Sequence, residues 1–224
     1  MDMQRHQSGF TLIEISIVLV IIGLILGGAL KGQELITSAK VRSSINQIDG
    51  VKAAYYAFQD RYRALPGDYA QATDNLPPAP PGATAIADGT GNGQITTAAE
   101  KGQLWLHMGV AGFLNGDYDG AATTSTFDCV TTTCPANAFS GPLQILFSSQ
   151  AASSSATSHE LITGRRMPVG IVAEIDRKID DGQPNGGIFR RPDSGTFSAC
   201  INGDEWNVAT NDPRADCVGI IRGL

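Results

Sequence analysis

The sequence predicts an α+β protein in which one long N-terminal helix packs on a small antiparallel sheet. Three observations support this fold class. An apolar run covers residues 10–30, a helical pattern of apolar residues continues to residue 65, and short strand-like segments occur only in the second half. The 224 residues provide for this helix and for one globular domain with a hydrophobic core.

The apolar run contains one acid, Glu14, near its start. About 20 apolar residues are enough for a helix to span a bilayer, so residues 10–30 are predicted to be a transmembrane helix. A carboxylate inside such a helix costs about 2.5–3.5 kcal/mol on insertion scales. Glu14 therefore requires a compensating partner.

A secretory signal peptide does not explain this run, because no small-residue cleavage site follows Leu30. The small residue Gly9 instead lies before the run. Cleavage after Gly9 would remove residues 1–9 as a leader and make Phe10 a new N-terminus, with its amine one helical turn from Glu14. That amine, or the same amine of a neighbouring copy, is the expected partner of the acid.

Four glycines divide the apolar run and its end into two small-xxx-small pairs, Gly23 with Gly27 and Gly28 with Gly32. Such pairs allow helices to approach closely. One interpretation is a flexible single anchor; the other is a bundle of anchors in a filament core. Because Glu14 needs a partner, we favour the bundle.

Residues 31–65 are predicted to continue the helix as an amphipathic segment that ends at Pro66-Gly67. Apolar residues recur there at intervals of three and four, which places them on one stripe facing the sheet. These residues are Ile45, Ile48, Val51, Tyr55, Phe58, Tyr62 and Leu65.

The remainder, residues 66–224, is predicted to be a loop-rich globular domain. Residues 74–94 are expected to form a loop, and a helix should start at Thr97 with a capping box to Glu100 and end at Gly116. A second helix should run from Pro168 to Gly182. The expected strands are 143–147, 188–190, 196–201 and 218–221, and 148–158 is expected to be a low-complexity loop.

The segment from Gln7 to Glu14, Q-S-G-F-T-L-I-E, resembles the processing motif of type IV pilins and type II secretion pseudopilins. The resemblance implies the pilin fold, cleavage between Gly9 and Phe10 by a prepilin peptidase, N-methylation of Phe10, and a role for Glu14 in aligning filament subunits. Many relatives have proline where this chain has Lys31, so a proline-linked helix break is not expected.

Weaker similarity to larger pilin-like proteins continues beyond the motif. It involves Ala64-Leu65-Pro66-Gly67-Asp68-Tyr69, then Glu100 with Trp105 and His107, and finally the segment 175–182. Trp105 is expected to fill the core, and His107 to lie on the flank of its helix.

Charge and cysteine content indicate an exported domain. The leader carries Arg5 and His6, and a positive leader in the cytoplasm places the residues after Leu30 on the periplasmic side of the inner membrane. Four cysteines suit that oxidising compartment and allow three pairings. We favour Cys129 with Cys134 and Cys200 with Cys217, because each pair closes a compact loop.

Metal binding has weak support. The segment 88–94, D-G-T-G-N-G-Q, partly copies the start of a calcium loop, with Asp88 and Asn92 as candidate ligands. A plain glycine-rich turn is the alternative, and no cofactor is otherwise expected. A second acidic group, Asp176, Asp180 and Asp181 with Asp204 and Asp212 nearer the C-terminus, is interpreted as solvated turn acids.

Catalysis has little support in the sequence. His107 and His159 are isolated, and the serines cluster in a low-complexity stretch rather than in a nucleophile elbow. The acidic balance, 22 Asp and Glu against 16 Lys and Arg, gives no bulk attraction to nucleic acid. Two arginine pairs, Arg165-Arg166 and Arg190-Arg191, are candidates for a small anionic contact such as a DNA backbone, although a solvated edge is the simpler interpretation.

Together these observations predict a structural, non-enzymatic filament subunit, and we favour a minor over a major component. The resemblance implies other pilin or pseudopilin subunits, an inner-membrane platform protein and an assembly ATPase as partners. The alternatives are a tip adhesin or DNA-binding module on the same scaffold, displayed on the loops at 74–94 and 148–158, and an anchored periplasmic enzyme.

Overall fold

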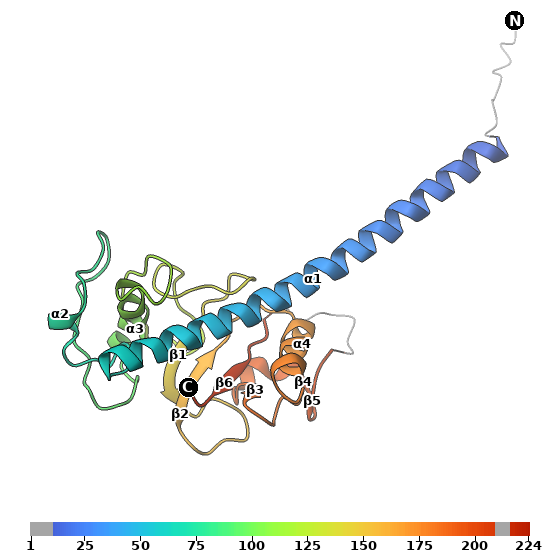
Figure 1. Ribbon diagram of the computed structural model, residues 1–224. Coiled ribbons are helices and arrows are strands. Elements are labelled where there is room, and N and C mark those ends of the chain that lie inside the picture. The colour runs from blue at the N-terminus through green and yellow to red at the C-terminus, as the bar shows by residue number, and fades with distance from the viewer. Residues whose placement is uncertain (1–10, 209–215) are drawn as a thin grey trace, which may run out of the picture. The chain divides into compact units, whose positions relative to one another are not determined.

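We describe a computed structural model of the chain, which covers residues 11–208 and 216–224 (Figure 1). The chain divides into two compact units, Met1–Lys40 and Val41–Leu224. The described part of the first unit, residues 11–40, contains the beginning of helix α1. The second contains the remaining elements and one hydrophobic core.

Helix α1 extends from Leu12 to Tyr62 and confirms the predicted long N-terminal helix. From residue 41 onward its buried residues recur at helical spacing, which confirms the predicted amphipathic segment. They are Val41, Ser44, Ile48, Val51, Ala54, Tyr55 and Phe58. Ile45, Tyr62 and Leu65 pack at the edge of the same core.

The helix ends three residues before the predicted boundary at Leu65, because the chain turns at Arg63. Arg63 adopts the left-handed conformation with φ of 53°, and its N–H donates to the Gln59 carbonyl at 2.9 Å. This geometry closes a helix C-terminus, where glycine is the usual residue. Pro66 and Gly67 follow in the turn.

Two further helices follow α1 before the first strand of the sheet. The short α2, Ala72–Asn75, lies at the start of the segment expected to be a loop. Helix α3, Ala98–Val110, begins with the predicted capping box between Thr97 and Glu100. Its predicted end at Gly116 is wrong: Gly112, with φ of 79°, ends the helix, and its N–H donates to Gly109 while Phe113 N–H donates to Met108.

The main sheet is antiparallel and has four strands in the order β1-β2-β6-β3. The strands are β1 (Gln144–Ser148), β2 (Ser158–Ile162), β3 (Phe189–Arg190) and β6 (Ile220–Arg222). β1, β3 and β6 confirm three of the predicted strands with small shifts of their ends. β2 was not predicted, and it occupies a central position in which Leu161 pairs with Ile145 and with Ile221.

The predicted strand at 196–201 is wrong for most of its length. Residues Gly195–Cys200 form a 3₁₀ helix, η1, and only Ile201 and Asn202 are extended, as β4. Phe197 and Cys200 are the buried residues of η1, and their spacing of three is that of a 3₁₀ turn. β4 pairs with β5, Glu205–Trp206, in a separate two-stranded sheet.

The second predicted helix is present as α4, Val169–Ile179, with Pro168 at its N-cap. Two disulfides, Cys129–Cys134 and Cys200–Cys217, join segments of the second unit, and these are the pairs favoured by the sequence. The core lies between the outer part of α1, α3, α4 and the main sheet, and its largest buried side chains include Trp105, Tyr55, Phe58 and Phe189.

Candidate functional site

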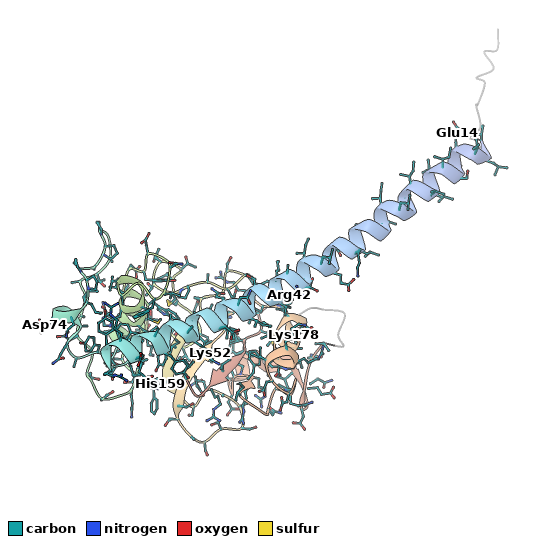
Figure 2. All side chains as sticks on the ribbon, viewed as in Figure 1. Glu14, Arg42, Lys52, Asp74, His159 and Lys178 are labelled. Atoms are coloured by element: carbon teal, nitrogen blue, oxygen red, sulfur yellow. A yellow bond between two sulfur atoms is a disulfide. The ribbon has the colours of Figure 1, made fainter. Side chains whose placement is uncertain are left out.

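The start of α1 is closed by a capping box that the sequence analysis did not identify. The N–H and hydroxyl of Thr11 donate to Glu14 Oε2 at 2.8 and 2.7 Å, and Glu14 N–H donates to the Thr11 hydroxyl at 3.3 Å. Figure 2 shows Glu14 in this first turn. The T-L-I-E sequence is the signal that could have revealed it. These hydrogen bonds satisfy one oxygen, and no cation among residues 11–208 and 216–224 pairs with the carboxylate.

Gly9 and Phe10, the predicted processing and methylation residues, lie outside the described residues, as do Arg5 and His6 of the leader. The structure therefore places only Glu14 of the predicted assembly residues. Glu14 is exposed at the start of an apolar helix.

The side chains that follow Glu14 form a continuous exposed apolar surface. Helix α1 is long and apolar enough to cross a membrane, with a mean hydropathy of 2.6 in its most apolar window. Exposed apolar surface of this extent marks a contact with a membrane or with other proteins. The exposed large apolar residues are Leu12, Ile13, Ile15, Ile17, Val18, Leu19, Val20, Ile21, Ile22, Leu24, Ile25, Leu26, Leu30, Leu35 and Ile36.

The glycines of this helix are not required by contacts within the described chain. A Cβ atom added at Gly23, Gly27, Gly28 or Gly32 would meet no atom within 4 Å. Each glycine in a helix interior costs about 1 kcal/mol relative to alanine. No contact among the described residues compensates for this destabilisation.

In the second unit, the motif residues after α1 form a buried polar cluster around Asp68. The Asp68 carboxylate accepts hydrogen bonds from the N–H groups of Gly91, Asn92 and Gly93 at 2.7, 3.2 and 2.7 Å. The Thr90 hydroxyl also donates to it at 2.9 Å. The turn after α1 is thereby fastened to the glycine-rich loop.

Glu100 joins the same loop to α3. The Thr90 N–H donates to its Oε1 at 3.3 Å. The Thr90 hydroxyl lies 2.8 Å from the same oxygen, so its single proton can be donated to Asp68 or to Glu100 but not to both at once. Glu100 Oε2 accepts from the N–H groups of Thr96 and Thr97 at 3.0 and 2.9 Å. Burial raises the pKa of Glu100, but these hydrogen bonds outweigh burial and lower the pKa below its usual value.

His107 completes this cluster and corrects one prediction. It is fully buried rather than on the flank of its helix, and its Nδ1 accepts from the N–H of Gly67 at 3.1 Å. Its ring stacks on Phe58 with centroids 6.2 Å apart. Burial lowers the pKa of His107 to about 4, so the imidazole is neutral at pH 7. The polar cluster is a scaffold, because internal groups already occupy its carboxylates and Nδ1.

The candidate calcium ligands accept hydrogen bonds from different protein groups. Asp88 accepts from the N–H and hydroxyl of Thr73, at 2.8 and 3.0 Å to Oδ1, whereas Asn92 Oδ1 accepts from Gln94 N–H at 2.8 Å. Three loop N–H groups point to Asp68 instead of leaving a cation cavity. Calcium binding at Asp88 and Asn92 stays a prediction.

The second acidic group is partly brought together. Carboxylate oxygens of Asp176, Asp180 and Asp181 lie within 4.8 Å of one another. Asp176 is buried and accepts from Trp206 Nε1 at 2.7 Å and from Gly182 N–H at 3.1 Å. Burial raises the pKa of Asp176 to about 6. Asp212 lies outside the described residues.

Protein groups bind both members of the first arginine pair. Arg165 forms a bidentate pair with Asp216 and lies over the ring of Phe197, 5.6 Å from its centroid. Arg166 donates to the Ser140 carbonyl at 2.9 Å.

The second arginine pair is held in the same way. Arg190 donates to the carbonyls of Gly187 and Ala152 at 2.8 and 3.1 Å. Arg191 donates to the Asn185 side chain at 2.7 Å. These partners favour structural roles, and the anionic contact at the two pairs stays a prediction.

Of the remaining candidates, Trp105 lies in the core and His159 is half-buried. Trp105 is 1% exposed, which confirms its predicted packing role. His159 lies on β2 beside the outer part of α1, as Figure 2 shows, with its ring 6.2 Å from that of Tyr55. His159 Nε2 accepts from Ile95 N–H at 3.4 Å.

Comparison with known families identifies the N-terminal segment. The family described as the prokaryotic N-terminal methylation motif matches residues 4–30. The chain is thus a protein with a prepilin-type N-terminus on a long apolar helix. That motif and helix, together with the mixed α+β domain, fit the type IV pilin and pseudopilin family. Neither a curated protein nor a solved structure matches the chain.

The motif has direct implications for function. It points to a structural subunit that is processed by prepilin peptidase and assembles with other pilin subunits. It also indicates membrane anchoring before assembly into a pilus-type filament.

Proposed function

We propose that this protein is a minor structural subunit of a type IV pilus or of a type II secretion pseudopilus. It is held in the inner membrane as a single-pass protein, with its N-terminus cytoplasmic and residues 31–224 periplasmic. A platform protein and an assembly ATPase then extract it into the filament. The observation that carries the proposal is the prepilin motif at residues 4–30 in front of an exposed apolar helix.

In this proposal, cleavage after Gly9 exposes the Phe10 amine, which is methylated. The cation then pairs with the Glu14 carboxylate of the same or a neighbouring subunit. The capping hydrogen bonds from Thr11 support this mechanism, since they orient Glu14 without neutralising it. A charge in hydrocarbon remains costly, so docking beside an amine is favourable.

The glycines of α1 support assembly through this helix. No contact within the described chain requires these glycines. Their small size instead allows neighbouring helices to approach closely. Lys31 and Glu34, which pair at 2.7 Å, mark the polar end of this contact segment.

The test separates the charge of Glu14 from its capping role. Glu14→Gln keeps a capping box, because glutamine serves at this position, but it removes the charge. Glu14→Val removes both. We expect both variants to be processed by the peptidase, and both to enter filaments at less than one tenth of the wild-type amount in sheared-filament immunoblots.

The matched control is Thr11→Ser, which keeps the capping hydroxyl and should assemble normally. Normal incorporation of Glu14→Gln would contradict charge pairing and would reduce Glu14 to a capping residue. An uncleaved leader in mass spectrometry of the native protein would contradict the whole proposal.

A second candidate is a binding module at the filament tip on the same scaffold. The observation that favours it is a cleft of about 630 Å³ in the second unit, whose lining includes Gln59, Tyr62 and Arg63. Contact with nucleic acid through the arginine pairs has less support, because all four guanidinium groups have protein partners. Replacing both pairs by alanine should leave DNA uptake unchanged if those roles are structural.

A further inference from the structure

A proline-rich segment follows α2 in the second unit. Its sequence from Leu76 to Gly82 is L-P-P-A-P-P-G. Proline fixes φ near −65°, and a residue that precedes a proline is kept out of the helical region. Every residue from 76 to 81 is either a proline or precedes one. The segment is therefore restricted to the polyproline II conformation, a helix with three residues per turn and no internal hydrogen bonds.

The structure shows an extended segment that is fixed at both ends. Leu76 is buried and extended, with φ of −92° and ψ of 150°, and residues 77–80 belong to no helix or strand. At the other end, Ala83 N–H donates to the Pro80 carbonyl at 3.1 Å across a turn in which Gly82 has φ of 91°. The segment is thus ordered before it meets a partner, which lowers the entropic cost of binding.

Much of the segment is open to solvent. Pro77, Pro78 and Pro81 are exposed. Prolines of the segment line two hollows of the surface, one of about 250 Å³ and one of about 500 Å³. The smaller hollow is completed by residues of α3 such as Leu106, and the larger by residues 83–86. Figure 1 shows the loop after α2 projecting from the second unit. Side chains of a partner can therefore reach the segment from two sides.

A second copy of this chain does not provide a matching surface. Polyproline II segments are recognised by grooves that are lined with several aromatic rings. Among residues 11–208 and 216–224, the aromatic residue with a large exposed side chain is Tyr56, and it is 43% exposed. The groove that fits this segment therefore belongs to a different protein.

The charges beside the segment are negative. Asp74 of α2, which Figure 2 labels, is exposed, and exposed Asp117 lines the smaller hollow. The described residues that line the two hollows include no lysine, arginine or histidine. Complementary charge suppresses wrong partners and fixes the register of an interface. A groove with basic residues at its rim suits this surface.

We propose that residues 76–82 dock as a polyproline II ridge in an aromatic groove of a different protein, with lysine or arginine at the rim of that groove. Because the conformation has three residues per turn, Pro78 and Pro81 lie on one edge of the ridge. Both are exposed, and they form the contact edge. The ridge shares no residue with the prepilin motif at 4–30, so the proposal goes beyond filament assembly.

The experiment is photocrosslinking of the full-length protein in the cells that produce it. The photoreactive substitution is Ala85→p-benzoylphenylalanine, because Ala85 is exposed and lines the larger hollow beside the ridge. We expect a crosslink to one protein other than this chain, at a site that mass spectrometry maps to a segment with several aromatic residues and a lysine or arginine. The control is Ala138→p-benzoylphenylalanine, at an exposed position in another loop, and it should not give this crosslink.

Further variants assign the contact to the prolines. Pro78→Ala combined with Pro81→Ala should lower the crosslink yield from position 85 about fivefold, because it removes the rings of the contact edge. The control Ala79→Ser keeps every proline and should leave the yield unchanged. Free peptide L-P-P-A-P-P-G at millimolar concentration should compete, whereas L-A-A-A-A-A-G should not. An unchanged circular dichroism spectrum of the double variant shows that a lower yield does not come from unfolding.

Absence of a crosslink from position 85, or a crosslink only to a second copy of this chain, would overturn the proposal and reduce the segment to a rigid spacer. A yield that persists unchanged in the double proline variant would overturn it as well, since the partner would then bind elsewhere. These failures are distinct from a failure of the filament proposal, which is scored by the incorporation of Glu14 variants into sheared filaments.

Discussion

The buried His107 predicts that acid destabilises the folded protein through one residue. Burial lowers its pKa to about 4 from 6.5, so the unfolded chain binds a proton between these values and the folded chain does not. The stability that neutral His107 contributes is therefore complete above pH 6.5 and is lost as the pH falls towards 4. At 1.36 kcal/mol per pKa unit, the loss is about 3 kcal/mol.

The hydrogen bond at His107 Nδ1 explains why protonation destabilises the folded protein. Nδ1 of His107 accepts a hydrogen bond from Gly67 N–H at 3.1 Å. A proton on Nδ1 would point at that N–H group, so protonation breaks the bond and leaves a charge in the core. Folding therefore favours the neutral ring.

The assay compares wild type with His107→Gln in urea unfolding of the full-length protein in detergent, followed by tryptophan fluorescence. The variant should be less stable at pH 7, because its packing is changed. The difference should shrink by about 3 kcal/mol between pH 7 and pH 4, since glutamine does not titrate. Parallel stability curves over this range would refute the reasoning.

Asp176 provides a control, because its protonation should stabilise the folded protein where protonation of His107 destabilises it. Burial raises its pKa to about 6 from 3.8, so the folded chain binds the proton first. Its contribution is present below pH 3.8 and is lost as the pH rises through 6. Relative to Asp176→Asn, wild type should gain about 2 kcal/mol on acidification from pH 7 to pH 4, because at pH 4 the unfolded carboxyl is already partly protonated. The two opposite slopes should leave wild type with a shallow pH profile in this range.

Three further measurements test the second unit. Thr97→Ala should cost about 1 kcal/mol in urea unfolding, whereas Thr97→Ser should cost much less, because serine also caps helices; equal losses would exclude the capping role. Replacing Cys200 and Cys217 by serine should cost about 3 kcal/mol, as their bridge closes a separation of 17 residues; unchanged stability would contradict this. Calcium at millimolar concentration should raise the unfolding temperature only if Asp88 and Asn92 bind it, and an unchanged temperature would remove that prediction.

Local patterns predicted the helices well because their signals lie within a few residues. The apolar residues from Ile45 to Tyr62 recur with the period of a helix that is packed on one side, and in the structure this side packs on the core. The Thr97 and Glu100 capping box is a contact between residues three apart. The ends of α1 and α3 differ from the prediction, because Arg63 and Gly112 close these helices before Pro66 and Gly116. The four-residue helix α2 was not predicted.

Strand β2 could not be read from local pattern. It contains His159 and Glu160 and follows a serine-rich stretch, so its composition resembles a loop. Glu160 is nonetheless fully buried, because Ser148 and the N–H groups of Gln150 and Ala151 hydrogen-bond its carboxylate. Such compensation comes from another segment and becomes visible only in the folded chain.

The polar cluster around Asp68 also could not be predicted from local sequence patterns. Asp68, Glu100 and His107 were singled out by resemblance, yet their spacing did not reveal that they meet. The Thr90 hydroxyl lies within hydrogen-bond distance of Asp68, 22 positions away in sequence, and of Glu100, 10 positions away. The alternate oxygen-bearing residues of 88–94 looked like a cation loop, but several of the loop N–H groups face a carboxylate of the protein itself.

Glycine is present for different physical reasons in the two units. In the second unit, a Cβ at Gly102 would collide with the Ala121 carbonyl and one at Gly141 with the Arg165 backbone, so the fold itself requires these glycines. In α1, a Cβ at Gly23 or Gly27 would meet nothing. Folding alone would favour alanine at both positions by about 1 kcal/mol each. The reason for these glycines must therefore lie outside the described chain, and neighbouring helices in a filament would supply it.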